Sequence, residues 1–179
     1  MHLNPYGEGA VHLAAELANR RPGTAGELVD RCRAAGLVVD GPVLPADLAR
    51  ILALLDSWES VVDAADERER AERLNRMLAA DAAHPRLTDH ADGWHLHYRD
   101  DHQPFAAVLS TLIAVGTAFH LVGRGMHRLG RCAVAECTTL FADTTRTGRR
   151  RYCSQLCANR DAVRRHRRAA RPATGPARA

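Results

Sequence analysis

Four cysteines near the end of the chain have the spacing of a metal site. They follow the pattern C-x4-C-x15-C-x3-C and are Cys132, Cys137, Cys153 and Cys157. Two close pairs bring four thiolates to one tetrahedral ion, and sulfur ligands in that geometry favour zinc. Four protein ligands leave no open position for water or substrate, so the spacing predicts one structural zinc ion and no zinc hydrolysis. His127 and His166 are then surplus to the coordination.

Two disulfides are the alternative use of these cysteines. The N-terminal residues lack the basic-then-apolar layout of a signal peptide, and no apolar run approaches the roughly 20 residues of a membrane span. A cytoplasmic protein without membrane attachment is therefore expected, and its reducing surroundings favour zinc over disulfides. The fifth cysteine, Cys32, has no second cysteine nearby in the sequence and is predicted to be a core residue.

Positive charge gathers around and after the second cysteine pair. Residues 1–127 carry 12 arginines against 18 acidic residues, whereas residues 128–179 carry 13 against 3. A short basic end beside an acidic body is typical of nucleic-acid contact. Arginine matches phosphate oxygens and guanine edges, and asparagine can pair with adenine. The candidate contacts are Arg149, Arg150, Arg151, Asn159, Arg160, Arg164, Arg165, Arg167 and Arg168.

A small module of few elements must position the cysteines. Leu140 and Phe141 favour a strand, residues 144–148 (TTRTG) a turn, and Ser154 can cap a helix on which Cys153 and Cys157 lie one turn apart. We expect a treble-clef-like order of knuckle, hairpin and basic helix. A module this small has almost no core of its own, so metal binding should supply most of its folding free energy.

The rest of the chain is predicted to be mainly α-helical. Apolar residues recur at helical spacing in five segments, which are residues 10–20, 24–36, 45–66, 66–81 and 104–123. The last is apolar on nearly all sides, as in a buried central helix, whereas the charge run of residues 66–81 is expected to be solvated. Glycines at 123, 125 and 130 place a joint at residues 124–130. The predicted organisation is a helical domain over 1–125, a zinc module over 126–171 and a disordered tail over 172–179.

One stretch of the helical domain has the alternation of a β-hairpin. Within residues 86–99 a turn at Ala91-Asp92-Gly93 precedes Trp94, and His95 and His97 then share one strand face. Two imidazoles there could share a metal, an anion or a ligand, and an ordinary outward polar face is the alternative. A regulator needs an input, so a small-molecule effector is expected near Trp94, His95 and His97. No nucleophile–base set or phosphate-binding glycine loop is visible, so we expect no enzyme activity.

The finger residues resemble a known bacterial family. The four cysteines, the segment CANR at Cys157–Arg160 and the approach RRRYCS are similar to CGNR zinc-finger proteins, whose N-terminal part is the ABATE domain. WHLHY at residues 94–98 and ELANRRP at residues 16–22 resemble ABATE positions. Ala158 replaces the glycine of the motif, which a helical position would tolerate.

The resemblance implies a stress-induced transcription regulator. We therefore expect DNA as the partner of the basic helix, with RNA binding or a zinc-stabilised protein-interaction module as alternatives. A single helix reads few base pairs, so specific binding would require a homodimer formed through the helical domain.

Overall fold

The computed structural model describes residues 7–39, 41–89, 93–100 and 102–170 of the 179-residue chain. Within these ranges it contains six α-helices and two antiparallel two-stranded sheets. The elements of the N-terminal part are α1 (Glu8–Asn19), α2 (Ala25–Ala34), α3 (Pro45–Val62), α4 (Glu67–Asp81), β1 (Arg86–Asp89), β2 (Trp94–His97) and α5 (Phe105–Arg124). The C-terminal part consists of β3 (Leu129–Arg131), β4 (Leu140–Ala142) and α6 (Gln155–Ala169). The mainly helical fold class is confirmed.

Local sequence explains where the helices begin and end. Thr24 accepts a hydrogen bond from the backbone N–H of Glu27 (3.1 Å) and caps α2, and Asp66 caps α4 in the same way through Glu69. Pro45 occupies the first turn of α3, where its missing N–H costs nothing. Gly36, with a φ of +78°, ends α2 in a conformation that glycine adopts without strain.

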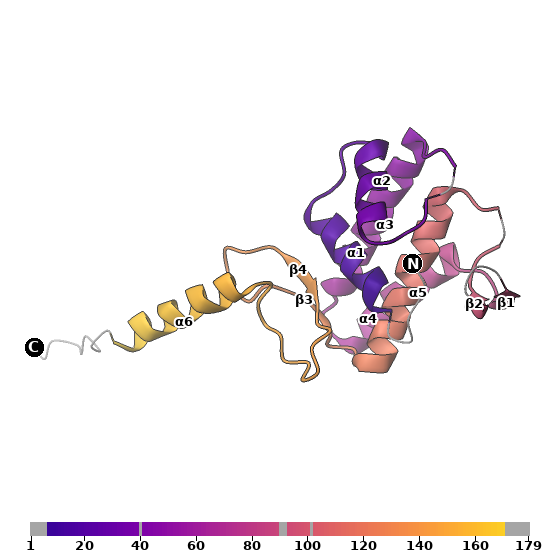
Figure 1. Cartoon of the computed structure of the whole chain (residues 1–179). Helices are drawn as coiled ribbons and strands as arrows, with labels where there is room; N and C mark the ends of the chain where they lie inside the picture. The colour runs from indigo at the N-terminus through magenta and orange to yellow at the C-terminus, as the bar shows by residue number, and fades with distance from the viewer. Residues whose placement is uncertain (1–6, 40, 90–92, 101, 171–179) are drawn as a thin grey trace, which may run out of the picture.

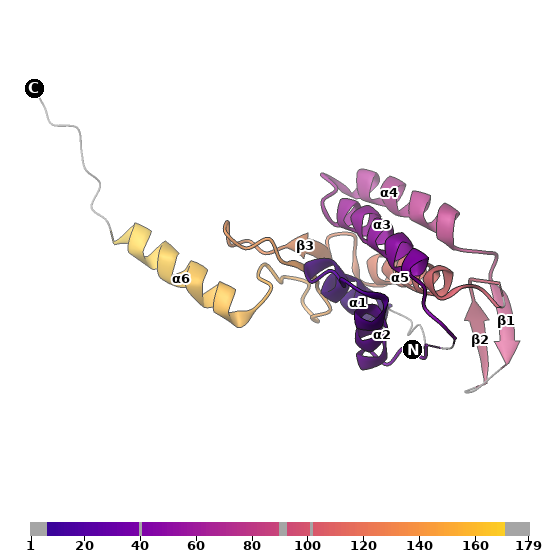
Figure 2. The same cartoon turned by 90° about the horizontal axis from the view of Figure 1, so that it is seen from above.

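Helix α5 is the centre of the body, and α1, α3 and α4 pack around it (Figures 1 and 2). Trp58 of α3 is fully buried, and its indole N–H donates to Thr117 of α5 (3.0 Å). Helix α1 starts very close to α5. A Cβ on Gly7 would lie 1.9 Å from the carbonyl oxygen of Gly116, so a side chain at this position would clash with α5. Cys32 lies in the same core with no exposed surface, as predicted, and burial raises the pKa of its thiol to about 12.

The expectation that no apolar run approaches the length of a membrane span is wrong for α5. Residues 105–124 form the one helix in the described part of the chain that is long and apolar enough to cross a membrane by length and composition. Its most apolar window is 78% buried inside the protein, where α1, α3 and α4 cover it. Its apolar surface is therefore explained by the core that it forms.

The charge run of α4 is also not uniformly solvated. Arg70 is only 9% exposed and donates to the carbonyl oxygens of Val61 (3.1 Å), Val62 (3.0 Å) and Met126. These contacts satisfy the C-terminal carbonyls of α3 and tie α4 to the segment that follows α5. Burial lowers the pKa of Arg70.

The predicted hairpin of residues 86–99 forms as β1 and β2. Leu87 pairs with Leu96, and Asp89 with Trp94; Ala91 and Asp92 of the predicted turn lie outside the described residues. Tyr98 follows β2 and anchors the base of the hairpin, because its ring packs edge-on against Phe119 of α5 at 5.8 Å between ring centroids. The hairpin lies at the opposite end of the molecule from α6 (Figures 1 and 2).

The second sheet belongs both to the body and to the cysteine module. Strand β4 pairs with β3, so this hairpin encloses the first cysteine pair. The prediction of a hairpin after the knuckle is therefore wrong, because the TTRTG turn does not connect two paired strands. Leu129, Leu140 and Ala142 of this sheet are buried in the same core as the helices. The predicted joint at residues 124–130 is consequently short, and β3 and β4 lie against α3 and α1.

Candidate metal centre and basic helix

The structure brings the four predicted cysteines together. Their sulfur atoms all lie within 4.8 Å of one another, with 3.7 Å between Cys137 and Cys153 and 3.6 Å between Cys153 and Cys157. Four ligands at the Zn–S distance of about 2.3 Å place tetrahedral sulfurs about 3.8 Å apart. The four sulfurs therefore fit one zinc ion. His127 and His166 are not part of the cluster, as expected.

The first pair lies on a knuckle that the β3–β4 hairpin holds. Cys132 directly follows β3, and its N–H donates to the carbonyl oxygen of Thr139 (2.9 Å). The N–H of Cys137 donates to the carbonyl oxygen of Val134 (2.8 Å) and closes the turn between the two ligands. Thr139 also contacts the sulfur of Cys137 (3.3 Å between Oγ1 and Sγ), and the side chain and backbone of Thr139 lower the pKa of Cys137 to about 6. Burial raises the pKa of Cys153 to about 11, so the thiolate is favoured at Cys137 and disfavoured at Cys153 before a metal binds.

The second pair lies at the start of α6. Ser154 caps the helix, as predicted, by accepting a hydrogen bond from the N–H of Cys157 (3.3 Å). Arg150 donates to the carbonyl oxygens of Tyr152 (3.0 Å) and Cys153, which fixes the backbone around the third ligand. Val134 is fully buried against Cys132 and Cys157 and, with partly buried Tyr152, makes up the small apolar centre of the module. Such a small cluster makes the fold depend on the metal.

Two side-chain contacts fix the direction of α6. The hydroxyl of Tyr152 donates to Asp161 (2.6 Å), and Arg164 forms an ion pair with Glu136 of the knuckle (2.7 Å). Neither Glu136 nor Asp161 was among the predicted site residues. The signal for both was present, since they are two of only three acidic residues after position 127. Held in this way, α6 extends away from the body (Figures 1 and 2).

The predicted nucleic-acid residues occupy three different environments. One side of α6, together with the knuckle, forms a concave surface with a volume of about 540 Å³. It includes the predicted residues Asn159, Arg160, Arg164, Arg167 and Arg168. Arg165 is exposed but paired with Asp161 (3.0 Å), and Arg149 and Arg151 are exposed on the loop before the helix.

Arg150 and Asn159 also have partners within the module. Arg150 is half-buried, holds the backbone of the second cysteine pair and stacks over Phe141 at 5.1 Å from the ring centroid. Asn159 accepts a hydrogen bond from Gln155 (2.8 Å). Asn159 lies inside α6, whose N-terminal cap is Ser154.

Polar contacts join the module to the body. Arg131 of β3 reaches both carboxylate oxygens of Asp63 (2.6 and 2.7 Å) and Glu59 of α3 (3.2 Å). Asn19 of α1 accepts from the backbone N–H of Leu140 (2.8 Å) and donates to its carbonyl oxygen (2.9 Å). The orientation of the metal centre is therefore set by the helical body.

The histidine pair of the hairpin lies on one face, as its spacing predicts. The Nε2 atoms of His95 and His97 are 3.1 Å apart, and Nδ1 of His95 lies 2.7 Å from the carbonyl oxygen of Gly93. Trp94 is 73% exposed, so its ring does not form the wall of a cavity over the two histidines. Binding of a ligand by Trp94, His95 and His97 stays a prediction.

Comparison with known families agrees with this architecture. Residues 128–170 match the CGNR zinc finger, so the four cysteines form a structural zinc site. Residues 11–124 match the ABATE family, which is described as "Putative stress-induced transcription regulator". A search of curated proteins finds no match to the chain. The ABATE match spans more than half of the sequence and the zinc finger follows it, and the chain belongs to the ABATE family.

Proposed function

We propose that this protein is a cytoplasmic DNA-binding transcription regulator that presents α6 to the major groove. The observation that carries the proposal is the position of α6, which the zinc centre holds away from the body with a row of exposed arginines. Among the described residues, Arg160, Arg167 and Arg168 have no hydrogen-bond or ion-pair partner. An α-helix fits the major groove, and free guanidinium groups suit phosphates and guanine edges.

The chemistry of the metal supports a binding role over catalysis. A zinc ion held by four cysteines has no open coordination position, so it supplies rigidity and no reactive water. Arg164 is engaged by Glu136 and Asp161, and Arg150 by backbone carbonyls, so these two arginines orient the surface. Contact with DNA then falls mainly to Arg160, Arg167 and Arg168, with Asn159 beside them for a base edge.

RNA is the nearest alternative partner. A positively charged helix binds RNA phosphates by the same electrostatics, and RNA proteins usually read single-stranded or looped segments. The third alternative is an acidic protein surface. Exposed arginines attract any polyanion, so by themselves they do not distinguish DNA, RNA and an acidic protein surface. The experiment must separate these three partners.

The test is selection from a randomised duplex DNA pool by the zinc-loaded full chain across a salt titration, beside matched RNA. We expect an enriched sequence that still binds near physiological salt. Replacing Arg160 and Arg167 by alanine removes two phosphate or base contacts and should reduce the slope of log K against log salt by about two. Alanine is a good helix former, so α6 itself should remain intact.

The matched control removes two arginines from the body. Arg33 and Arg68 are exposed on α2 and α4, and their double alanine variant should bind like the wild type. Preference for looped RNA over duplex DNA at equal salt would replace the proposal by the RNA alternative. Binding to neither nucleic acid would leave protein docking.

A further inference from the structure

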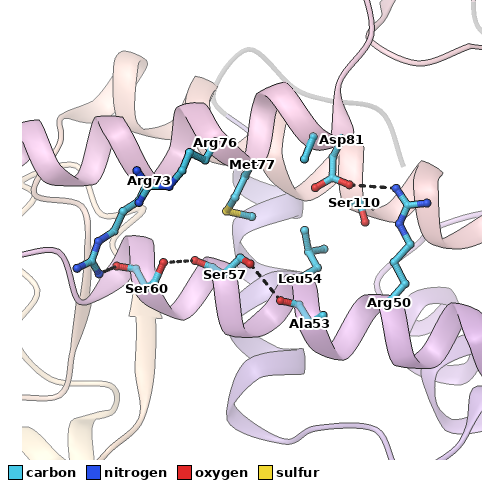
Figure 3. A pocket seen from close by; sticks show the side chains of 11 residues that line it. Arg50, Ala53, Leu54, Ser57, Ser60, Arg73, Arg76, Met77, Asp81 and Ser110 are labelled. Atoms are coloured by element: carbon cyan, nitrogen blue, oxygen red, sulfur yellow. Dashed lines mark hydrogen bonds and ion pairs between the residues drawn. The ribbon is translucent and has the colours of Figure 1, made fainter.

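The groove between α3 and α4 contains a cavity of about 370 Å³. Figure 3 shows its lining from these two helices, with Ser110 of α5 behind them. It exists because small side chains line the groove, among them Ala53, Ser57, Ser60 and Ala80. Its volume is within the range of small-molecule sites. It is separate from the metal centre, from α6 and from the β1–β2 hairpin.

The charge of this cavity is positive. Three of its lining residues are arginines and one is an acid. Arg50 is paired with Asp81 (3.2 Å), and Arg73 with Glu69 outside the lining (2.5 Å). Arg76 has no ion pair or hydrogen bond to any described residue. A free guanidinium beside a second one, in a hollow, is suited to an anion.

Ser110 supplies an independent reason to expect a ligand. Its side chain is fully buried, and its hydroxyl has no hydrogen-bond partner among the described residues. The two other buried hydroxyls of α5 are satisfied, since Thr117 donates to the carbonyl oxygen of Ile113 (2.6 Å) and Thr111 to that of Asp81. An unsatisfied buried hydroxyl costs stability, because its hydrogen bonds to water are lost and not replaced. A ligand acceptor in the cavity would remove this cost.

The cavity has polar ends and an apolar middle. In Figure 3, Arg73 and Arg76 lie toward one end, Ser110 lies beside Asp81 and Arg50 at the other, and Met77 lies between them. Leu54 faces Met77 across the groove in the same view. The carboxylate of Asp81 disfavours a second negative charge at the Ser110 end. An uncharged acceptor, such as a carbonyl oxygen, suits that end better.

We infer that this cavity binds a small organic acid that carries an uncharged carbonyl or hydroxyl oxygen at its far end. The acid group lies against Arg76 and Arg73, the carbon chain against Leu54 and Met77, and Ser110 donates to the far oxygen. This binding does not depend on the proposed DNA contact, because the cavity lies wholly within the helical body.

The test measures binding to the zinc-loaded full chain by amide chemical shifts in NMR titrations. The probes are levulinate and its longer keto-acid homologues, the matching simple acid valerate, and the uncharged methyl propyl ketone. We expect saturable shifts from α3, α4 and α5, with a keto acid binding more tightly than the simple acid of equal length and the ketone most weakly. Shifts confined to α6, or none that saturate, would overturn the inference.

Three variants assign the contacts. Arg76→Ala should weaken both acids about tenfold, whereas Arg68→Ala, which changes a 90%-exposed arginine of the same helix outside the cavity, should leave binding unchanged. Ser110→Ala should abolish the advantage of the keto acid over the simple acid. It should also leave the urea midpoint of the free protein unchanged or raise it, because no hydrogen bond is lost. Equal loss in the Arg68 and Arg76 variants would contradict the site.

Discussion

At the scale of single residues, Asn19 shows how a side chain can act as a strand. Its amide forms with Leu140 the two hydrogen bonds that a neighbouring strand would form with that residue. Strand β4 is hydrogen-bonded to β3 on one side only, so this amide satisfies the backbone of its outer edge. The contact also joins α1 to the element that carries the knuckle.

We predict that Asn19→Ala lowers the free energy of unfolding by about 2 kcal/mol, because it leaves partly buried backbone groups of Leu140 without partners. Urea unfolding followed by circular dichroism measures the change. Asn75→Ala is the control, since Asn75 is exposed on α4 and alanine suits a helix. A loss no larger than that of the control would show that water replaces the amide without cost.

The cysteines give the second prediction at this scale. Cys153→Ser removes one of four ligands, so we expect less than one zinc per chain and loss of the α6 signal in circular dichroism, because the module has little other core. Cys32→Ala should keep one zinc per chain, since Cys32 lies in the body, at a stability cost of about 1 kcal/mol. Elemental analysis of the purified proteins decides, and full zinc in the Cys153 variant would contradict the assignment.

At the scale of elements, α5 combines an apolar surface with one buried base. His120 is fully buried, and neither ring nitrogen has a well-formed hydrogen bond to a described residue. Burial lowers the pKa of His120, and the positive charges of Arg124, His12 and Arg128 act in the same direction against a backbone contact to Arg128. The folded protein therefore holds this imidazole neutral.

Protonation of His120 consequently destabilises the fold. Below its unfolded pKa of about 6.5 the unfolded chain binds a proton that the folded chain does not, so the free energy of unfolding falls as pH drops through this range. We predict a shallower fall for His120→Leu, which cannot bind the proton. Urea unfolding between about pH 7.5 and pH 5.5 compares the two slopes.

Other groups act in both proteins and cancel in this comparison. His12 has a pKa that is lowered, chiefly by burial, and it adds its own share. Asp143 also has a lowered pKa, because hydrogen bonds from Thr145 and Arg150 favour its charged form despite its desolvation. Its contribution to the free energy of unfolding is therefore lost only at more acidic pH. Equal slopes for wild type and variant would mean that His120 does not titrate in this window.

At the scale of the whole molecule, the body and the zinc module share one core. Leu129, Leu140 and Ala142 belong by sequence to the module and by packing to the helices. Arg131 adds ion pairs to Glu59 and Asp63 at the end of α3. Removing β3 and β4 from the helical body should therefore lower its stability.

We predict that a chain ending at Gly125 is several kcal/mol less stable than the full protein, at roughly 1.5–3 kcal/mol for each buried leucine removed. A chain ending at Thr144 keeps β3 and β4 but loses two cysteines and α6, so it should retain most of the stability of the body. Denaturant midpoints of the three proteins test this. Equal midpoints for the two truncated chains would show that the strands add little to the core.

The sequence alone determined the features that depend on local pattern. Helical periodicity placed the helices, the cap at Thr24 and the cap at Ser154 were readable from residue type, and the cysteine spacing defined the zinc ligands before any geometry was known. These features persist in the structure because each depends on neighbours within a few turns of chain.

Only the tertiary structure decided the features that join distant segments. It paired β4 with β3 across the knuckle, buried Arg70 within a charge run expected to be solvated, and divided the arginines into those that hold the module and those left free on α6. It also opened the cavity between α3 and α4, away from the hairpin histidines. The physical reason is that burial and pairing depend on which surfaces meet in space, and identical residue types on one element therefore receive different partners.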